Sequence, residues 1–374
     1  MEKSYKIRIY PNEQQRILIH KTFGCCRFVF NYYLNKRTRL YNEEHKNFSY
    51  SKCCEDLTLL KKNENYSWLK EVDSVALQCS LQNLDWAFVN FFNGKHYPKY
   101  KKKTHSFRYK TKMTHNNIKV FDTHIQLPKL GLVKYKGSYN VQGRILNVIV
   151  SQEPSGEYYA IICTTNHDVI SLQQTNKQIG IDLGINDYCV TSDGEIYNNP
   201  RYFKKSEDKI KKLHKSLRRK TPGGKNWEKA RVRLAKAYKK ITNQKEDYLH
   251  KLSKQLINEN DYLAIEDLNV KDLLTSADGT TNKVKTATRR AMLDVSWGKF
   301  IRFLNYKSKF YGRTLVKIPQ EYASSQYCHV CGHKNVNLNK NYSKEWICPC
   351  CGTYLQRDIN AAINILNESL LIAT

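Results

Sequence analysis

Three carboxylates in this chain lie where an isolated charge is costly. Asp182 falls within an apolar strand-like alternation, Glu266 ends a second short apolar strand, and Asp358 opens an apolar helix. Each alone could cap a turn or pair with a lysine. Together they supply the hard oxygens that two Mg²⁺ ions need, one ion to activate a water and the other to stabilise a leaving oxygen. The three positions therefore predict a two-metal site for phosphodiester hydrolysis.

The backbone around Asp182 is rich in glycine. Gly180 and Gly184 flank the carboxylate, and we expect them to leave room for a hydrated metal or a phosphate. A turn follows, and residues 188–191 are typical of the return strand of a hairpin.

A second metal site is indicated by two Cys-x-x-Cys pairs, each closed by a glycine. This spacing is typical of a zinc ribbon, in which four thiolates fill a tetrahedral, structural site. Cys350 makes the second pair ambiguous but breaks the two-residue spacing, and His329 and His333 are substitute ligands. The ligands we expect are Cys328, Cys331, Cys348 and Cys351.

The charge of the chain points to a polyanionic partner. With 63 Lys+Arg against 34 Asp+Glu, the formal charge is +29, and nucleic acid is the leading candidate. An acidic membrane surface is the rival, but no apolar run approaches about 18 residues. The first residues lack the apolar core of a signal peptide. The scattered spacing of the other eight cysteines favours a reducing cytoplasm.

Two segments combine features that suit nucleic-acid contact. Residues 96–112 mix basic residues with aromatic rings, so they could neutralise phosphates and stack on bases. Residues 209–240 carry fourteen Lys+Arg against one acid, Glu228, and a phosphate backbone would relieve their mutual repulsion. A solvated loop and a solvated helix face are the alternatives. The contact residues we single out are Lys101, Lys102, Lys103, Arg218, Arg219 and Lys220.

The remaining segments have recognisable periodicities. Apolar alternation over 117–165 predicts a small antiparallel barrel or sheet, and 272–290 has the composition of a mobile loop. We predict a strand over 3–10. We predict helices that begin at 13, run from 49 or 51 to 60, span 74–92, lie on either side of 221–224, and span 294–311.

Several motifs resemble the TnpB family, the RNA-guided DNA endonucleases of insertion sequences, also described as the transposase OrfB. The carboxylates lie in GIDLGIND, AIEDLN and RDINAAINI, which look like the three RuvC blocks of that family. The resemblance covers nearly the whole chain and includes YPNEQQ, FGCCRFVFNYYL, LPKLGLVKYKG and YASSQYCHVCG. One departure is Gln356, where members often carry an acid.

The resemblance implies an α/β, mixed, multidomain fold. It contains a small β-barrel (wedge-like) with an inserted helical lobe, then an RNase H-like RuvC nuclease domain with an inserted zinc ribbon. The expected ranges are 1–10 and 96–170 for the barrel, 11–95 for the helical recognition lobe, 171–320 and 353–374 for the nuclease, and 321–352 for the ribbon.

The resemblance also implies the activity and partners. A guide RNA from the transposon end would select double-stranded target DNA beside a short adjacent motif. Asp182, Glu266 and Asp358 would hold two Mg²⁺, with Mn²⁺ as a substitute, beside structural Zn²⁺. Tyr50, Gln78 and Thr114 fall at motif-contacting positions, and Gln78 could read adenine. The expected assembly is a monomeric protein in a ribonucleoprotein without membrane association, in a prokaryotic cytoplasm and on the nucleoid when DNA-bound.

Other functions share parts of this signature. A miniature type V CRISPR effector has the same core, although 374 residues is short for one. An RNA-guided repressor without cleavage would not require the triad, which this chain retains. A strand transferase would need a joining activity for which the sequence has no dedicated feature, and a plain resolvase would not need the lobe and barrel.

Overall fold

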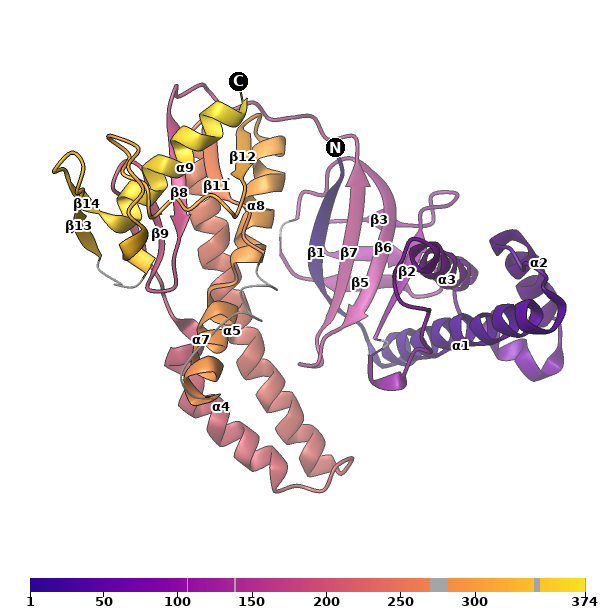
Figure 1. The fold of residues 1–374 in the computed structure, drawn as a ribbon. Helices are drawn as coiled ribbons and strands as arrows, with labels where there is room; N and C mark the ends of the chain where they lie inside the picture. The colour runs from indigo at the N-terminus through magenta and orange to yellow at the C-terminus, as the bar shows by residue number, and fades with distance from the viewer. Residues whose placement is uncertain (106, 138, 270–281, 340–343, 374) are drawn as a thin grey trace. The chain divides into compact units, whose positions relative to one another are not determined.

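The computed structural model describes residues 1–374 except 106, 138, 270–281, 340–343 and 374. The chain forms two compact units, Met1–His167 and Asp168–Thr374 (Figure 1). No helix among the described residues is both long and apolar enough to cross a membrane.

The first unit is built on a seven-stranded antiparallel sheet of order β2-β6-β7-β1-β5-β4-β3. The expected barrel is wrong, because the described edge strands β2 and β3 each pair with one neighbour and the sheet stays open. Two-residue β3 offers too short an edge to close a barrel. The strands are β1 Lys3–Tyr10, β2 Arg108–Lys112, β3 Lys119–Val120, β4 His124–Leu127, β5 Gly131–Tyr135, β6 Arg144–Gln152 and β7 Tyr158–Thr165.

Helices of the first unit share one apolar core with this sheet. The long helix α1 begins with a capping box. The backbone N–H of Gln15 donates to Asn12 Oδ1 (2.9 Å), and the backbone N–H of Asn12 donates to Gln15 Oε1 (3.0 Å). Phe23 and Leu77 join strand residues such as Ile7 and Val148 in the core. The helical elements are α1 Glu13–Glu44, α2 Tyr50–Leu60, η1 Glu64–Lys70, α3 Ser74–Phe92 and η2 Lys103–His105.

The second unit contains a five-stranded mixed sheet of order β10-β9-β8-β11-β12. β11 runs parallel to β8 and β12, whereas β8, β9 and β10 form antiparallel hairpins. This arrangement confirms the expected mixed α/β fold. The strands are β8 Gln178–Leu183, β9 Asp187–Thr191, β10 Ile196–Asn198, β11 Tyr262–Glu266 and β12 Thr314–Ile318.

Helices cover both faces of that sheet. Leu256 and Phe300, from α5 and α8, pack with Ile181 and Ile265 on one face, whereas Ile365 of α9 packs on Ala264 on the other. The remaining elements are α4 Tyr202–Arg218, α5 Lys225–Glu259, α7 Asn282–Val295, α8 Trp297–Phe310, η3 Val336–Asn339, β13 Glu345–Ile347, β14 Tyr354–Gln356 and α9 Arg357–Ala373.

Two expectations about helices need correction. The helix expected over 294–311 begins at Trp297, because Ser296 adopts a left-handed conformation (φ 59°) that separates α7 from α8. The loop expected over 272–290 is helical from Asn282, and its residues 272–281 lie outside the described part of the chain.

Candidate active site and metal centre

The three carboxylates lie on adjoining elements of the second unit. Asp182 is on β8, Glu266 ends β11, and Asp358 is in the first turn of α9. Ile181 pairs with Ile265 across the parallel strands, so Asp182 and Glu266 come next in register. Neighbouring strands are about 4.8 Å apart. All three carboxylates are half-buried.

The carboxylates interact electrostatically. Burial raises the pKa of Asp182 from 3.8 to about 8, and repulsion from Glu266 and then Asp358 adds to this, against an opposing effect of Arg357. Burial also raises the pKa of Glu266, which a hydrogen bond from Ser324 partly offsets. The three carboxylates are near enough to interact electrostatically, but among the described residues only the four cysteines below form a group close enough to hold one ion. Carboxylate oxygens are the ligands that Mg²⁺ prefers.

The glycines near Asp182 serve packing, not the approach of a ligand as expected. A Cβ at Gly180 would lie 2.0 Å from the Ala362 carbonyl oxygen, so glycine lets α9 lie directly on β8. This close approach holds the start of α9, and with it Asp358, at the sheet. A Cβ at Gly184 would lie 2.6 Å from the Asp187 carbonyl oxygen, so this glycine permits the hairpin turn.

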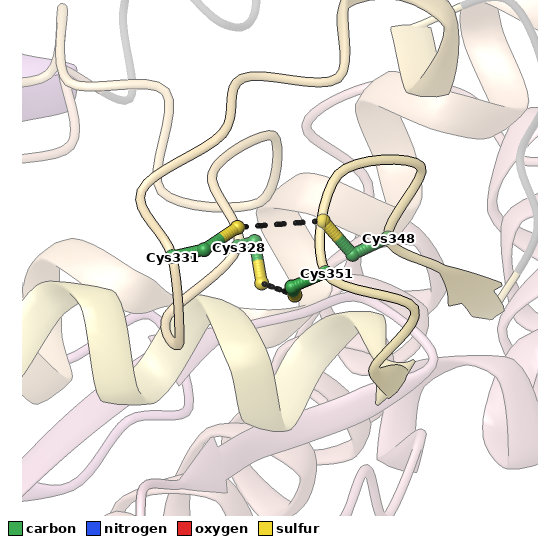
Figure 2. A group of neighbouring side chains, drawn as sticks. All are labelled: Cys328, Cys331, Cys348 and Cys351. Carbon is green, nitrogen blue, oxygen red and sulfur yellow. Dashed lines mark hydrogen bonds between the residues drawn. The ribbon is translucent and has the colours of Figure 1, made fainter.

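The four cysteines of the two Cys-x-x-Cys pairs converge on one point (Figure 2). Their Sγ atoms all lie within 4.8 Å of one another, with Cys328–Cys351 at 3.7 Å and Cys331–Cys348 at 3.6 Å. Four thiolates bound tetrahedrally at the usual Zn–S length of about 2.3 Å are about 3.8 Å apart. The cluster therefore has the dimensions of a Cys₄ zinc site.

The two halves of the cluster have the same backbone geometry. The amides of Gly332 and Gly352 donate to the carbonyls of Cys328 and Cys348, both at 2.9 Å, and both glycines have positive φ (73° and 71°). Cys350 is exposed and outside the cluster.

The substitute histidine ligands are not in the cluster either. The ring of His329 instead hydrogen-bonds through Nδ1 to Asn360 Oδ1 at 3.0 Å. His333 contributes a backbone carbonyl, which accepts a hydrogen bond from the Cys328 amide at 2.9 Å.

A hydrogen-bond network missed by sequence reasoning joins the cysteine cluster to the carboxylates. Asn360 and Asn364, buried on α9, each donate to the Tyr327 carbonyl at 2.6 Å, and Asn364 also donates to the Ser324 carbonyl at 2.8 Å. The Ser324 hydroxyl donates to Glu266 Oε1 at 2.6 Å. Two amides spaced by four on an otherwise apolar helix face were the available signal.

The proposed motif-contacting residues all belong to the first unit. Gln78 is exposed on α3. Thr114 is exposed after β2, and its Oγ1 accepts a hydrogen bond from Asn117 Nδ2 at 3.0 Å. Tyr50 begins α2 and packs partly against the core, and burial raises its pKa to about 12.

The six basic residues singled out for nucleic-acid contact differ in exposure. Lys102, Lys103, Arg218 and Arg219 are exposed, whereas Lys220 is half-buried. Lys101 is also half-buried, with its Nζ 3.8 Å from the centroid of the Phe30 ring. Burial lowers the Lys101 pKa to about 8.

Comparison with known proteins identifies the family. A family model described as "Probable transposase" matches residues 161–277, one described as "Cas12f1-like, TNB domain" matches 297–365, and one described as "Helix-turn-helix domain" matches 1–46. A "Putative RNA-guided DNA endonuclease" of Streptomyces pristinaespiralis is 34% identical over 99% of this chain and 90% of its own length. The chain belongs to the TnpB family.

Other similarities agree with this membership. The "Putative RNA-guided DNA endonuclease InsQ" of Escherichia coli K12 is 31% identical over 97% of this chain and 91% of its own length. Among solved structures, that of the "mini-RNA-guided endonuclease CRISPR-Cas_phi3" aligns with a TM-score of 0.51 at 9% identity, covering 99% of this chain and 92% of that one. At that identity the structural match supports the shared fold alone.

Proposed function

We propose that this TnpB-family protein is an RNA-guided DNA endonuclease that cuts double-stranded DNA by RuvC-type phosphodiester hydrolysis. The observation that carries the proposal is the placement of Asp182, Glu266 and Asp358 on adjoining strands and a helix start, where burial and the other two carboxylates raise the Asp182 pKa. The names of relatives that match almost end to end support the same activity.

Asp182, Glu266 and Asp358 would hold two Mg²⁺. When bound, these ions would supply an activated water and stabilise the leaving oxygen. The three carboxylates would hold the ions from separate elements: Asp182 from β8, Glu266 from the end of β11 and Asp358 from the first turn of α9. Ser324 orients Glu266 through its 2.6 Å hydrogen bond. The new P–O bond to water and the broken P–O3′ bond leave 5′-phosphate and 3′-hydroxyl ends.

Zinc would hold the ribbon as a structural ion, bound by Cys328, Cys331, Cys348 and Cys351. Its role in catalysis is indirect. Asn360 and Asn364 tie the chain that enters the ribbon to the helix whose first turn carries Asp358. A folded ribbon therefore helps to hold both Ser324 and Asp358 in place.

Base pairing with a guide RNA would select the target, and the protein would read a short adjacent motif. The net charge of +29 suits the phosphates of both strands, and the hairpin of α4 and α5 combines an apolar inner seam at Ile210 and Leu234 with many basic residues. Tyr50, Gln78 and Thr114 are the proposed motif contacts, and Lys101, Lys102, Lys103, Arg218, Arg219 and Lys220 are the proposed backbone contacts.

The cellular setting follows from the same proposal. The guide RNA would come from the transposon end, and cleavage would support maintenance of the insertion sequence. The protein would act as a monomer within a ribonucleoprotein in the cytoplasm, on the nucleoid when DNA-bound.

Co-purification tests the guided activity. The protein is expressed with its native 3′ flank, the bound RNA is sequenced, and cleavage of a plasmid matching that RNA is measured with and without Mg²⁺. We expect a discrete RNA and Mg²⁺-dependent cleavage that disappears when the target is mismatched. Guided binding without cleavage would favour a repressor. Cleavage of any duplex without a defined RNA would contradict the guided function.

A further inference from the structure

A groove of about 660 Å³ lies in the first unit between α1 and the segment that leads into β2. It is distinct from the carboxylate site, which belongs to the second unit. Its lining includes Arg16, His20, Gly24 and Arg27 of α1, together with Lys103 and Phe107. These α1 residues recur at intervals of three or four, so they share one face of the helix.

Gly24 is the most informative residue of this groove. Glycine in a helix interior is unfavourable relative to alanine, and here it stands inside the 32-residue helix α1. Apart from its chain neighbours and the adjoining backbone of α1 itself, no described atom lies within 4 Å of the place where its Cβ would be, and its φ is not positive. Neither packing nor backbone conformation therefore requires glycine at this position. A side chain at this position would instead project into the groove, so glycine keeps this part of the groove open.

The walls of the groove combine positive charge with an exposed ring. Within the described part of the chain, no carboxylate pairs with Arg16, Arg27 or Lys103, although Glu13 also borders the groove. The Phe107 side chain is 39% exposed, and its ring centroid lies 6.4 Å from that of the buried Phe23 ring. One side of the Phe107 ring therefore packs on the core. Cations beside a ring that is fixed but accessible are what a nucleotide needs: phosphate neutralisation and a stacking surface.

A polar pair lies at the same face. His20 Nε2 and the Tyr158 hydroxyl are 2.9 Å apart, and both residues line the groove. Burial lowers the pKa of His20 and thereby favours the neutral ring, which has one donor and one acceptor nitrogen. These groups could hydrogen-bond to a base edge.

We propose that this groove binds one unpaired nucleotide of a nucleic-acid strand held by the protein. The base lies over Gly24 and stacks on Phe107, and Arg16, Arg27 and Lys103 neutralise the adjoining phosphates. The inference rests on the proposed RNA-guided function, and the strand is either the guide RNA or the target DNA.

Filling the groove tests the proposal with full-length protein. Gly24→Leu is compared with Gly298→Leu, a matched control at another helical glycine that likewise has no neighbour within 4 Å of its Cβ position. Affinity is measured for the RNA that co-purifies and, in the assembled ribonucleoprotein, for matching DNA. We expect Gly24→Leu to weaken the affinity for one of the two strands by about 5- to 150-fold, the range for loss of one stacked base, and the control to change neither affinity.

Thermal melting separates this role from a structural one. Leucine is a better helix former than glycine and meets open space, so Gly24→Leu should melt at the same temperature or higher. Weaker binding with an undiminished melting temperature supports the groove. Unchanged affinity for both strands would overturn the proposal.

Photocrosslinking identifies the strand. Ribonucleoprotein is assembled with guide RNA containing 4-thiouridine, or with target DNA containing 4-thiothymidine, and crosslinked peptides are mapped by mass spectrometry. We expect crosslinks at His20 or Phe107 from one of the two strands, and their loss in Gly24→Leu. Crosslinks elsewhere in a ribonucleoprotein that cleaves its target would overturn the groove and leave the proposed function intact. A protein without defined RNA would instead overturn the function.

Discussion

The hydroxyl of Ser324 donates a hydrogen bond to Glu266 Oε1 at 2.6 Å. Ser324 precedes the first cysteine pair by only a few residues, and its carbonyl is held by Asn364 of α9. Glu266 at the end of β11 is thereby connected to the start of the ribbon. The connection gives the ribbon a physical route to the carboxylates without any contact to the substrate.

Ser324→Ala should weaken Mg²⁺ binding and slow cleavage by about 10- to 100-fold, the usual cost of removing a partner of a metal-ligating carboxylate. Isothermal titration of Mn²⁺ or Mg²⁺ into the protein reports binding separately from catalysis. Ser324→Thr, which keeps the hydroxyl, is the matched control and should retain most of both. Equal metal affinity in the alanine and threonine variants would contradict the role of this hydrogen bond.

The geometry of the cysteine cluster predicts that variants of neighbouring cysteines differ in zinc content. Cys348→Ser or Cys351→Ser should lose zinc, whereas Cys350→Ser should retain one zinc per chain, because Cys350 lies outside the cluster. Elemental analysis of purified protein measures the content. Loss of zinc should lower the melting temperature of the second unit and reduce cleavage, since Asn360 and Asn364 would lose their fixed partners. Zinc loss in Cys350→Ser would show that the ligand set is wrong.

Gly180→Ala should disturb the active site through helix packing. Its Cβ would lie 2.0 Å from the Ala362 carbonyl oxygen, so α9 must move away from β8. Such overpacking costs about 1–3 kcal/mol, a fall in melting temperature of about 3–10 °C. Differential scanning calorimetry and cleavage assays measure the two effects. In Gly298→Ala the added Cβ meets no neighbour, so melting temperature and cleavage should both stay at the wild-type level. A Gly180→Ala protein with wild-type melting temperature and cleavage would contradict the close packing of α9 on β8.

The raised pKa of Asp182 predicts a pH dependence of stability in metal-free protein. Folded Asp182 keeps its proton to about pH 8, whereas the unfolded chain loses it near its ordinary value of 3.8. The folded state therefore binds more protons between these values, and the free energy of unfolding falls as pH rises through this window. Asp182→Asn should flatten this slope.

Melting in EDTA from pH 5 to pH 8 measures the effect. We expect the melting temperature of Asp182→Asn to exceed that of the wild type by on the order of 5 °C at pH 8 and by less at pH 5. Mg²⁺ should raise the melting temperature of the wild type more than that of the variant. A constant difference across the pH range would contradict the assignment.

Much of the fold could be predicted because its periodicities are local. The bounds of β1 and α3 follow from alternation and from apolar spacing, and the two-residue spacing of the cysteines follows from the geometry of one metal knuckle. Each signal lies within a short stretch of chain, so the sequence contains it whole.

Long-range packing could not be predicted in the same way. The open edge of the first sheet depends on which strands pair, and alternation does not encode pairing. The role of Gly180 depends on α9, more than 170 residues later. In the sequence Lys101 is indistinguishable from its basic neighbours Lys102 and Lys103, and only the fold reveals that its ammonium lies against Phe30.

The most direct test of the central claim is single-turnover cleavage of a matching plasmid by the purified ribonucleoprotein in Mg²⁺. Asp182→Asn, Glu266→Gln and Asp358→Asn should each lower the rate by about 1000-fold or more while RNA and target binding persist. Asp267→Asn is the matched control, because Asp267 is an exposed neighbour of Glu266 that pairs with Lys317 at 2.8 Å. The Asp267→Asn protein should cleave at the wild-type rate. Undiminished cleavage by any of the three triad variants would contradict the assignment of these carboxylates as the active site.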